Sequence, residues 1–213
     1  MKRNGIIVLL FMLVLRPLLN ADDAIRENWG NLRITKSLSE KMKADFRTEL
    51  RYIDPFDQYF NYFDLGLSWK INTWAFVSAD FRHITKRSGT KWSKEYWPYA
   101  DLKMTKAVQK FNLSNRSRLE VRIKEDENMI LYRNKLEVKL PKLTKVKLQP
   151  FVADDVFLDI DNSELYRNRV HAGIACVYFK SVKYALSYIL ESTWKNDIRN
   201  DKDIFLLELH YAF

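Results

Sequence analysis

The amino-acid sequence predicts an all-β protein, an antiparallel up-and-down transmembrane β-barrel of 10–12 strands with a polar lumen. The clearest indication is the segment 111–124, where apolar residues such as Leu119, Val121 and Ile123 alternate with polar or charged ones. Successive side chains of a strand point to opposite faces, so this strand has an apolar face and an ionic face. It is also much longer than the usual strand of about five or six residues. These features are typical of a barrel wall with lipid outside and water inside.

The same alternation recurs along most of the chain, and ten strands are expected from residue 42 onwards. They are predicted at 42–52, 63–70, 75–82, 95–105, 111–124, 130–140, 146–154, 166–178, 182–194 and 205–213. Bacterial barrels have an even number of strands. The segment 29–38 is an eleventh candidate that breaks this parity. Either a further short strand brings the number to twelve, or this segment lies against the wall.

The connections are expected to alternate in length. Those near 71–73, 106–109, 141–145 and 180–182 are short, whereas those near 53–58, 85–94, 155–165 and 195–203 are longer and polar. Outer-membrane barrels have short periplasmic turns and longer extracellular loops. The pattern therefore predicts that the last strand runs inwards and ends at the periplasmic rim.

The first residues predict export from the cytoplasm. Lys2 and Arg3 precede an apolar stretch at 5–15, and a cleavage point is expected after Ala21. This is the layout of a secretory signal peptide, and the apolar stretch is too short to span a bilayer. We therefore expect a cleaved signal peptide at 1–21, an N-terminal segment with room for an extra strand at 22–41, and the barrel at 42–213. The expected location is the bacterial outer membrane.

The last strand predicts an assembly signal. Leu209, Tyr211 and Phe213 lie on its apolar face, and the chain ends on the aromatic residue. Outer-membrane barrels commonly end in this way, and the barrel-assembly machinery recognises such ends. The expected partners are this machinery and the lipids of the outer membrane.

The basic charge balance does not indicate nucleic acid. The formal net charge is +9, but the charges are spread over nearly every strand at every second position. A nucleic-acid site gathers Lys and Arg in a patch, so no nucleic-acid partner is expected. Cys176 is the only cysteine and lies on an apolar face, which excludes an intramolecular disulfide.

Several strand motifs resemble those of the DUF2490 family. They are Glu49-Leu50-Arg51 at the end of a strand, the run Phe63-Asp64-Leu65-Gly66-Leu67-Ser68-Trp69-Lys70, the motif Tyr132-Arg133-Asn134-Lys135-Leu136, and a tryptophan in the N-terminal strand. The similarity extends over nearly the whole chain after residue 21. The family consists of small predicted outer-membrane proteins without an established activity. The resemblance therefore implies a fold and a location, and no catalytic residue.

The strongest candidate site is an array of charged side chains on the polar face of the strands. It consists of Arg47, Glu49, Arg51, Asp80, Arg82, Arg116, Arg118, Glu120, Arg122, Arg133, Lys135, Glu137, Lys139, Arg167, Arg169, Glu191 and Glu208. Opposite charges on neighbouring strands pair and brace a wall. Alternatively, the excess of Arg and Lys lines a porin-like pore that prefers anions. The low glycine content and the long cationic side chains favour a largely filled lumen, with a structural or narrow-channel role.

Two other classes of protein remain as alternatives. In a lipid hydrolase or acyl-modifying barrel, His171, Ser187 and Glu191 would supply a base, a nucleophile and an orienting acid. A soluble periplasmic lipocalin-like binder would invert the pattern, with apolar residues inside. Since the three polar residues face the lumen rather than lipid, we expect no enzyme and no catalytic residue.

Neither a metal nor a cofactor is expected. Asp154, Asp155, Asp159 and Asp161 could offer oxygen ligands to Ca²⁺, but they lack the glycine and terminal glutamate of an EF-hand, which favours an acidic surface loop. An aromatic cluster occupies one further stretch and is expected to belong to a membrane-interface girdle. Its members are Phe56, Tyr59, Phe60, Tyr62 and Phe63.

Overall fold

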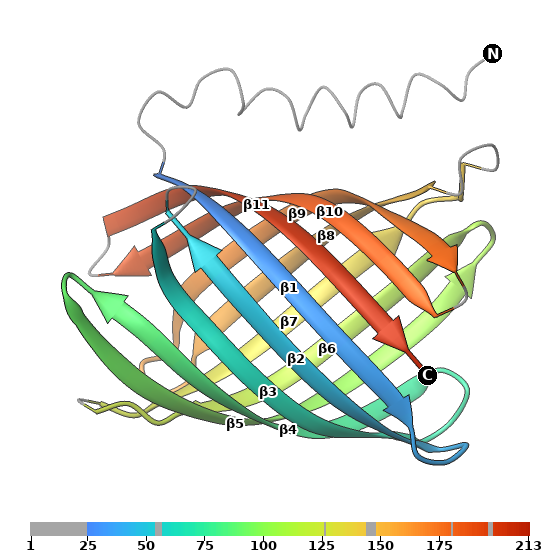
Figure 1. The fold of residues 1–213 in the computed structure, drawn as a ribbon, viewed down its shortest axis with the longest axis horizontal. Helices are drawn as coiled ribbons and strands as arrows, with labels where there is room; N and C mark the ends of the chain where they lie inside the picture. Colours follow the sequence, from blue (N-terminus) through green and yellow to red (C-terminus); the bar gives the residue numbers. More distant parts are fainter. Residues whose placement is uncertain (1–24, 54–56, 126, 144–147, 180, 196–197) are drawn as a thin grey trace.

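The described residues form a closed barrel of eleven strands in the computed structural model (Figure 1). The structure describes residues 25–53, 57–125, 127–143, 148–179, 181–195 and 198–213; the predicted signal peptide lies outside them. The strands are β1 (Ile25–Ser37), β2 (Met42–Tyr52), β3 (Gln58–Lys70), β4 (Ala75–Ser88), β5 (Lys91–Val108), β6 (Phe111–Arg122), β7 (Met129–Lys139), β8 (Leu148–Asp159), β9 (Glu164–Phe179), β10 (Val182–Lys195) and β11 (Ile198–Ala212). The all-β barrel with 10–12 strands is therefore confirmed.

The barrel is mixed rather than wholly antiparallel. From β1 to β11 each strand pairs antiparallel with the next, but β1 also pairs parallel with β11, in a register that joins Ile25 to Lys202 and Thr35 to Ala212. Figure 1 shows β1 and β11 side by side with their arrowheads at the same end. Strands joined by hairpins alternate in direction, so an odd number can close into a ring only through one parallel pair.

The expectation of an even strand number is therefore wrong. The N-terminal candidate strand neither needs a twelfth strand nor lies against the wall, because β1 is itself a full wall strand between β2 and β11. The barrel accordingly begins at residue 25 rather than at residue 42. The parity rule failed because it assumes that antiparallel pairing closes the ring.

The predicted sorting of the connections by length is also wrong. The residues expected as a loop at 85–94 continue the ladder of β4 and β5 as far as the pair Ser88 and Lys91, with Gly89 at a φ of 60° in the turn. The longest connection, 140–147, lies at the rim expected to carry short turns. These polar stretches continue as strands, because charged side chains can occupy alternating positions and pair across strands as apolar side chains do. We call the rim where β1 and β11 end the C-terminal rim.

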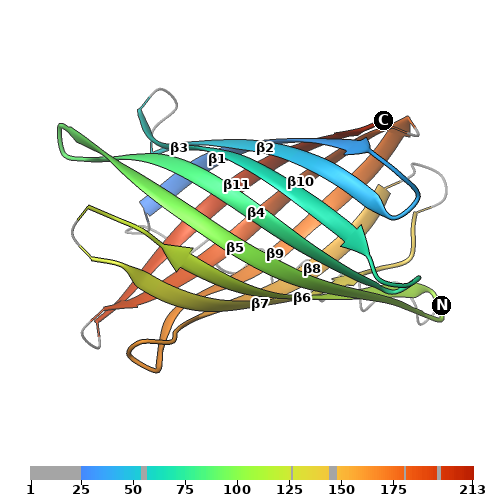
Figure 2. The same ribbon diagram turned by 90° about the horizontal axis from the view of Figure 1, so that it is seen from below.

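The wall has an apolar outer face and a polar inner face. Outward side chains such as Leu65, Phe81 and Leu186 are about half exposed, whereas Asp64, Arg118 and Glu120 on the inner face are almost fully buried. The strands run obliquely around the interior, as Figure 2 shows from a second direction. Within the described ranges no helix has the length and apolar character needed to cross a membrane.

Candidate functional site

The structure places the predicted charge array inside the barrel. Side chains of the array line two connected regions of the interior. The first region contains Arg47, Glu49, Arg51, Asp80, Arg82, Arg118, Glu120, Arg122, Arg133, Arg167, Arg169 and Glu191. The second contains Glu137 and Lys139, together with Arg116, Lys135 and Glu208, which line the boundary between the two regions. We call the first region the plug and the second the vestibule.

Arginines in the plug stack on aromatic rings. The guanidinium carbon of Arg118 lies 3.6 Å from the ring centroid of Tyr99, and that of Arg51 lies 3.7 Å from Trp29. Further contacts join Arg122 to Trp97 at 3.9 Å, Arg82 to Tyr62 at 4.1 Å and Arg133 to Phe157 at 4.5 Å. A desolvated cation over an aromatic face is stabilised by about 2 kcal/mol or more. Each of these stacks joins two neighbouring strands: β1 and β2, β3 and β4, β5 and β6, or β7 and β8.

Carboxylates hold the same arginines. Arg82 lies 2.8 Å from Asp64, which also accepts a hydrogen bond from the hydroxyl of Tyr99. Arg118 donates to both oxygens of Asp101, at 2.6 and 2.9 Å. Arg169 pairs with Glu191 at 2.6 Å, and Arg133 pairs with Asp155. Each of these arginines thus meets a carboxylate on an adjacent strand, as the bracing interpretation requires.

Two tryptophans in the plug share a local motif. Trp29 Nε1 donates to Glu27 at 2.9 Å, and Trp97 Nε1 donates to Glu95 at 2.8 Å. In both cases the glutamate precedes the tryptophan by two residues and so lies on the same inward face. The space left among the plug side chains is a cavity of about 190 Å³ lined mainly by polar and cationic groups.

Gly66 gives Asp80 the room it needs to reach Arg47. Gly66 and Asp80 are direct neighbours on β3 and β4, and a Cβ at residue 66 would lie 1.8 Å from Asp80 Oδ1. Asp80 Oδ1 in turn lies 2.7 Å from Arg47 Nη2.

A Gly66→Ala variant is therefore expected to displace Asp80 and to lower the free energy of unfolding by about 1–3 kcal/mol. The measurement is urea unfolding of the protein refolded in detergent micelles. Gly30→Ala is the matched control, because a Cβ there meets nothing within 4 Å. Equal losses in the two variants would contradict this role of Gly66.

The vestibule opens towards the C-terminal rim. One of its cavities, of about 360 Å³, is lined by cations and carboxylates from β1, β5, β6, β7, β10 and β11. A second, of about 290 Å³, shares Arg33, Lys103, Arg116 and His210 with the first. Ala175 and Ala185 line the larger cavity, and their short side chains leave the space that long side chains occupy in the plug.

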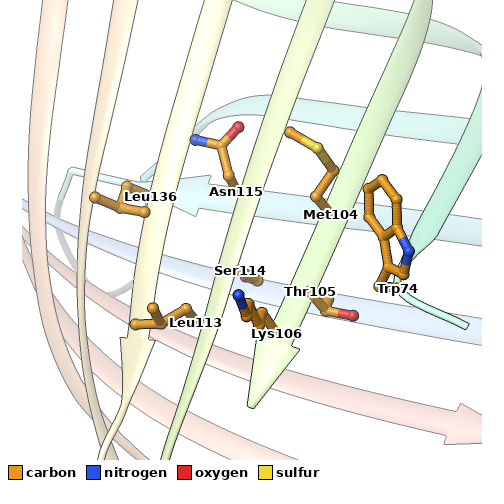
Figure 3. A pocket seen from close by; sticks show the side chains of 8 residues that line it. All are labelled: Trp74, Met104, Thr105, Lys106, Leu113, Ser114, Asn115 and Leu136. Atoms are coloured by element: carbon orange, nitrogen blue, oxygen red, sulfur yellow. The ribbon is translucent and has the colours of Figure 1, made fainter. Parts of the chain in front are cut away.

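A groove on the outer wall forms a further hollow near the same rim, as Figure 3 shows. Its volume is about 500 Å³, and Met104 of β5, Leu113 of β6 and Leu136 of β7 line it together with Trp74. Asn115 also lines the groove, and its Nδ2 donates to Asn134 Oδ1 at 2.9 Å. These outward amides satisfy each other, so they can lie in apolar surroundings.

The residues of the hydrolase alternative do not form a catalytic relay. His171 and Ser187 lie on the neighbouring strands β9 and β10, but His171 Nε2 and Ser187 Oγ have no hydrogen-bond partner among the described residues. Glu191, the third member, accepts from Arg169 instead. Nucleophilic catalysis requires a base bonded to the nucleophile.

The acidic residues weighed as calcium ligands do not gather into one set of ligands among the described residues. Asp155 faces the plug, Asp154 accepts from Asn168 Nδ2 on the outer face at 2.7 Å, and Asp159 accepts from the backbone N–H of Asp161 at 3.0 Å. No group of three or more His, Cys, Asp or Glu side chains that could hold a metal ion occurs in the described part of the chain.

The girdle interpretation is wrong for three aromatic residues. Phe60 and Tyr62 are buried in the interior, and Tyr59 packs against them and donates to the buried Glu27. Phe63 is exposed on the outer face, and Phe56 lies outside the described residues. Sequence reasoning missed the aromatic half of the plug, although a signal existed. Phe60 and Tyr62 stand four and two positions before Asp64, just as Trp97 and Tyr99 stand four and two positions before Asp101, so they share the polar face.

The predicted assembly signal lies on the outer face of β11 at the C-terminal rim. Tyr211 and Phe213 are exposed, with their ring centroids 5.5 Å apart, and Leu209 precedes them on the same face. Phe213 N donates to Thr35 O of β1 at 3.0 Å. The final residue therefore takes part in closing the ring.

Fold and interior together define a closed, mixed β-barrel protein with an apolar exterior and a charged, partly filled lumen. The chain belongs to the family described as a protein of unknown function (DUF2490), which it matches over residues 26–201. The resemblance seen in the strand motifs is thereby confirmed. Searches of curated proteins and of solved structures gave no match.

Proposed function

We propose that this protein is an outer-membrane β-barrel that serves as a structural element and has no open solute path. The distribution of side chains supports the outer-membrane location, because it is the inverse of that in a soluble barrel. Large apolar side chains cover the outer face, and charged side chains fill the interior. Water favours the opposite arrangement, whereas lipid favours this one. In this proposal the partners are outer-membrane lipids and the barrel-assembly machinery.

The plug supports the second half of the proposal. Its arginines are stacked, paired and buried, so a solute would have to break several charge-assisted contacts to pass. The ion pairs of Arg82, Arg118 and Arg169 join three different pairs of neighbouring strands, β3 and β4, β5 and β6, and β9 and β10, through short contacts of 2.6–2.8 Å. Such contacts stabilise by more than neutral hydrogen bonds do. The proposal includes no enzymatic activity.

We expect the refolded protein to give no conductance steps in a planar lipid bilayer. A Trp29→Ala and Trp97→Ala double variant removes the two largest rings of the plug and is expected to give small, anion-preferring steps. The control is a Trp69→Ala and Trp92→Ala double variant, because both of those rings are exposed on the outer face. Conductance of the unmodified protein would contradict the closed lumen.

The location is checked by cell fractionation of the same protein. We expect it to sediment with the outer membrane and to shift in apparent size on heating in detergent, as closed barrels do. Recovery of folded protein from the soluble periplasm would contradict the membrane half of the proposal and would favour a soluble binder.

A further inference from the structure

Three cations stand side by side on the inner wall of the vestibule. Lys103 of β5 pairs directly with Arg116 of β6, and Arg116 pairs directly with Lys135 of β7. Like charges at directly opposed positions of neighbouring strands destabilise a sheet. This row therefore contrasts with the plug, where each arginine described above meets a carboxylate.

The row is not neutralised by neighbouring side chains. Among the described residues, Lys103, Arg116 and Lys135 form no ion pair within 4.0 Å, and the buried Nε of Arg116 has no hydrogen-bond partner. Two other cations of the cavity do have partners, since Arg33 pairs with Asp45 at 2.8 Å and Lys139 pairs with Glu137 at 3.3 Å. The three-cation row is thus left with its charge uncompensated.

The cavity in front of the row carries an excess of positive charge. Lys183, on the opposite wall, is a fourth cation without an ion pair in the described ranges, and Glu208 is a carboxylate without one. Four uncompensated cations therefore face one uncompensated carboxylate across a space of about 360 Å³. A low-dielectric wall strengthens such a field and raises the local concentration of anions.

We propose that the vestibule binds a phosphate group, which the row of Lys103, Arg116 and Lys135 holds. The guanidinium of Arg116 offers the forked donors that phosphate oxygens accept, and the two lysines add point charges on either side. Bound phosphate supplies the counter-charge that Arg116 lacks and removes the repulsion within the row. The group enters from the C-terminal rim, since the plug occupies the other half of the interior. This inference does not rest on the membrane location.

The test measures binding of inorganic phosphate and glycerol 3-phosphate to the full barrel refolded in uncharged detergent, by titration calorimetry at low chloride. Saturable one-to-one binding is expected. Arg116→Gln and Lys103→Gln are each expected to weaken it about tenfold or more, because each removes a charge-assisted contact. Lys106→Gln is the matched control, since Lys106 belongs to the same strand but lies on the outer face.

Thermal unfolding gives an independent readout. Without phosphate, Arg116→Gln is expected to unfold at a higher temperature than the unmodified protein, because the repulsion is relieved. With phosphate, the unmodified protein gains stability and the variant does not. If Arg116 only stabilised the fold, Arg116→Gln would instead unfold at a lower temperature than the unmodified protein. A variant that fails to fold without phosphate, or an unchanged response to phosphate in both Arg116→Gln and Lys103→Gln, would overturn the proposal.

The source of the phosphate group is distinguished by a lipid probe. If dihexanoyl phosphatidate binds more tightly than glycerol 3-phosphate, and Arg116→Gln loses this binding, the phosphate group belongs to a lipid headgroup. If glycerol 3-phosphate binds more tightly, the group belongs to a soluble phosphate ester. Absence of binding by either probe and by inorganic phosphate overturns the inference. Because the assay uses no bilayer, that failure is separate from any failure of the closed-barrel proposal.

Discussion

An Asp64→Asn variant is expected to lose about 3–5 kcal/mol of unfolding free energy, because it leaves a buried arginine without its counter-charge. The Asp64 side chain has no exposed surface and accepts from Arg82 Nε at 2.9 Å and from the hydroxyl of Tyr99. Asn keeps the shape but removes the charge that offsets the desolvation of Arg82. Urea unfolding of the protein refolded in micelles, followed by tryptophan fluorescence, measures the loss.

The control for Asp64 is an exposed ion pair of similar length. Arg199 and Asp201 lie 2.8 Å apart with side chains 60% and 54% exposed. Solvent screens such a pair, and its contribution is about 0–1 kcal/mol. Asp201→Asn should therefore change the unfolding free energy little. If both variants lost the same amount, the plug would contribute no more than a surface charge does.

Trp29→Ala is expected to have an effect of similar size, about 3–5 kcal/mol, through loss of packing and the cavity left behind. Trp29 packs with Ile189, Ile204 and Leu206 in a buried cluster, and its ring also lies under Arg51. It therefore fixes β1 to the strands on both of its sides. Besides the loss in urea unfolding, amide hydrogens of β1 should exchange faster than those of β6.

The control for Trp29 is Trp69→Ala. Trp69 lies on the outer face of β3 and is 54% exposed. Its removal leaves no enclosed cavity, so the loss should be smaller and exchange in β1 should not change. Uniform acceleration of exchange around the whole barrel in Trp29→Ala would contradict a local role at β1.

The alternation of apolar and polar residues accounts for most of what the sequence predicts correctly about the barrel wall. Alternation assigned the inner and outer faces of long strands such as β6 and β7, because burial of one face constrains every second residue. The same rule, applied to Phe60 or Trp97, would have placed aromatic rings inside. Phe60 is instead expected in the interface girdle because it is apolar, and no role is predicted for Trp97. A charged interior accepts these rings because arginines stack on them.

The closure of the ring could not be predicted from local pattern. Whether β11 pairs with β2 or with β1 depends on contacts between residues far apart in sequence, such as the 2.8 Å bond from Lys202 Nζ to Glu27. The three-cation row of the vestibule could not be predicted for a related reason. Lys103, Arg116 and Lys135 become neighbours only through the registers of three strands, and no single strand reveals whether its cation has a partner.

The parallel contact of β1 with β11 also imposes an order on assembly. Glu27 and Lys202 are separated by 175 positions, whereas each hairpin closes across a few residues. The cost in chain entropy grows with the length of the loop that is closed, so the hairpins form readily and the first and last strands meet late. Until they meet, the growing sheet has two unpaired edges that invite association with other chains. Phe213 takes part in this junction through its backbone bonds to Ser37 and Thr35, so the ring is closed only after β11 has paired with β1.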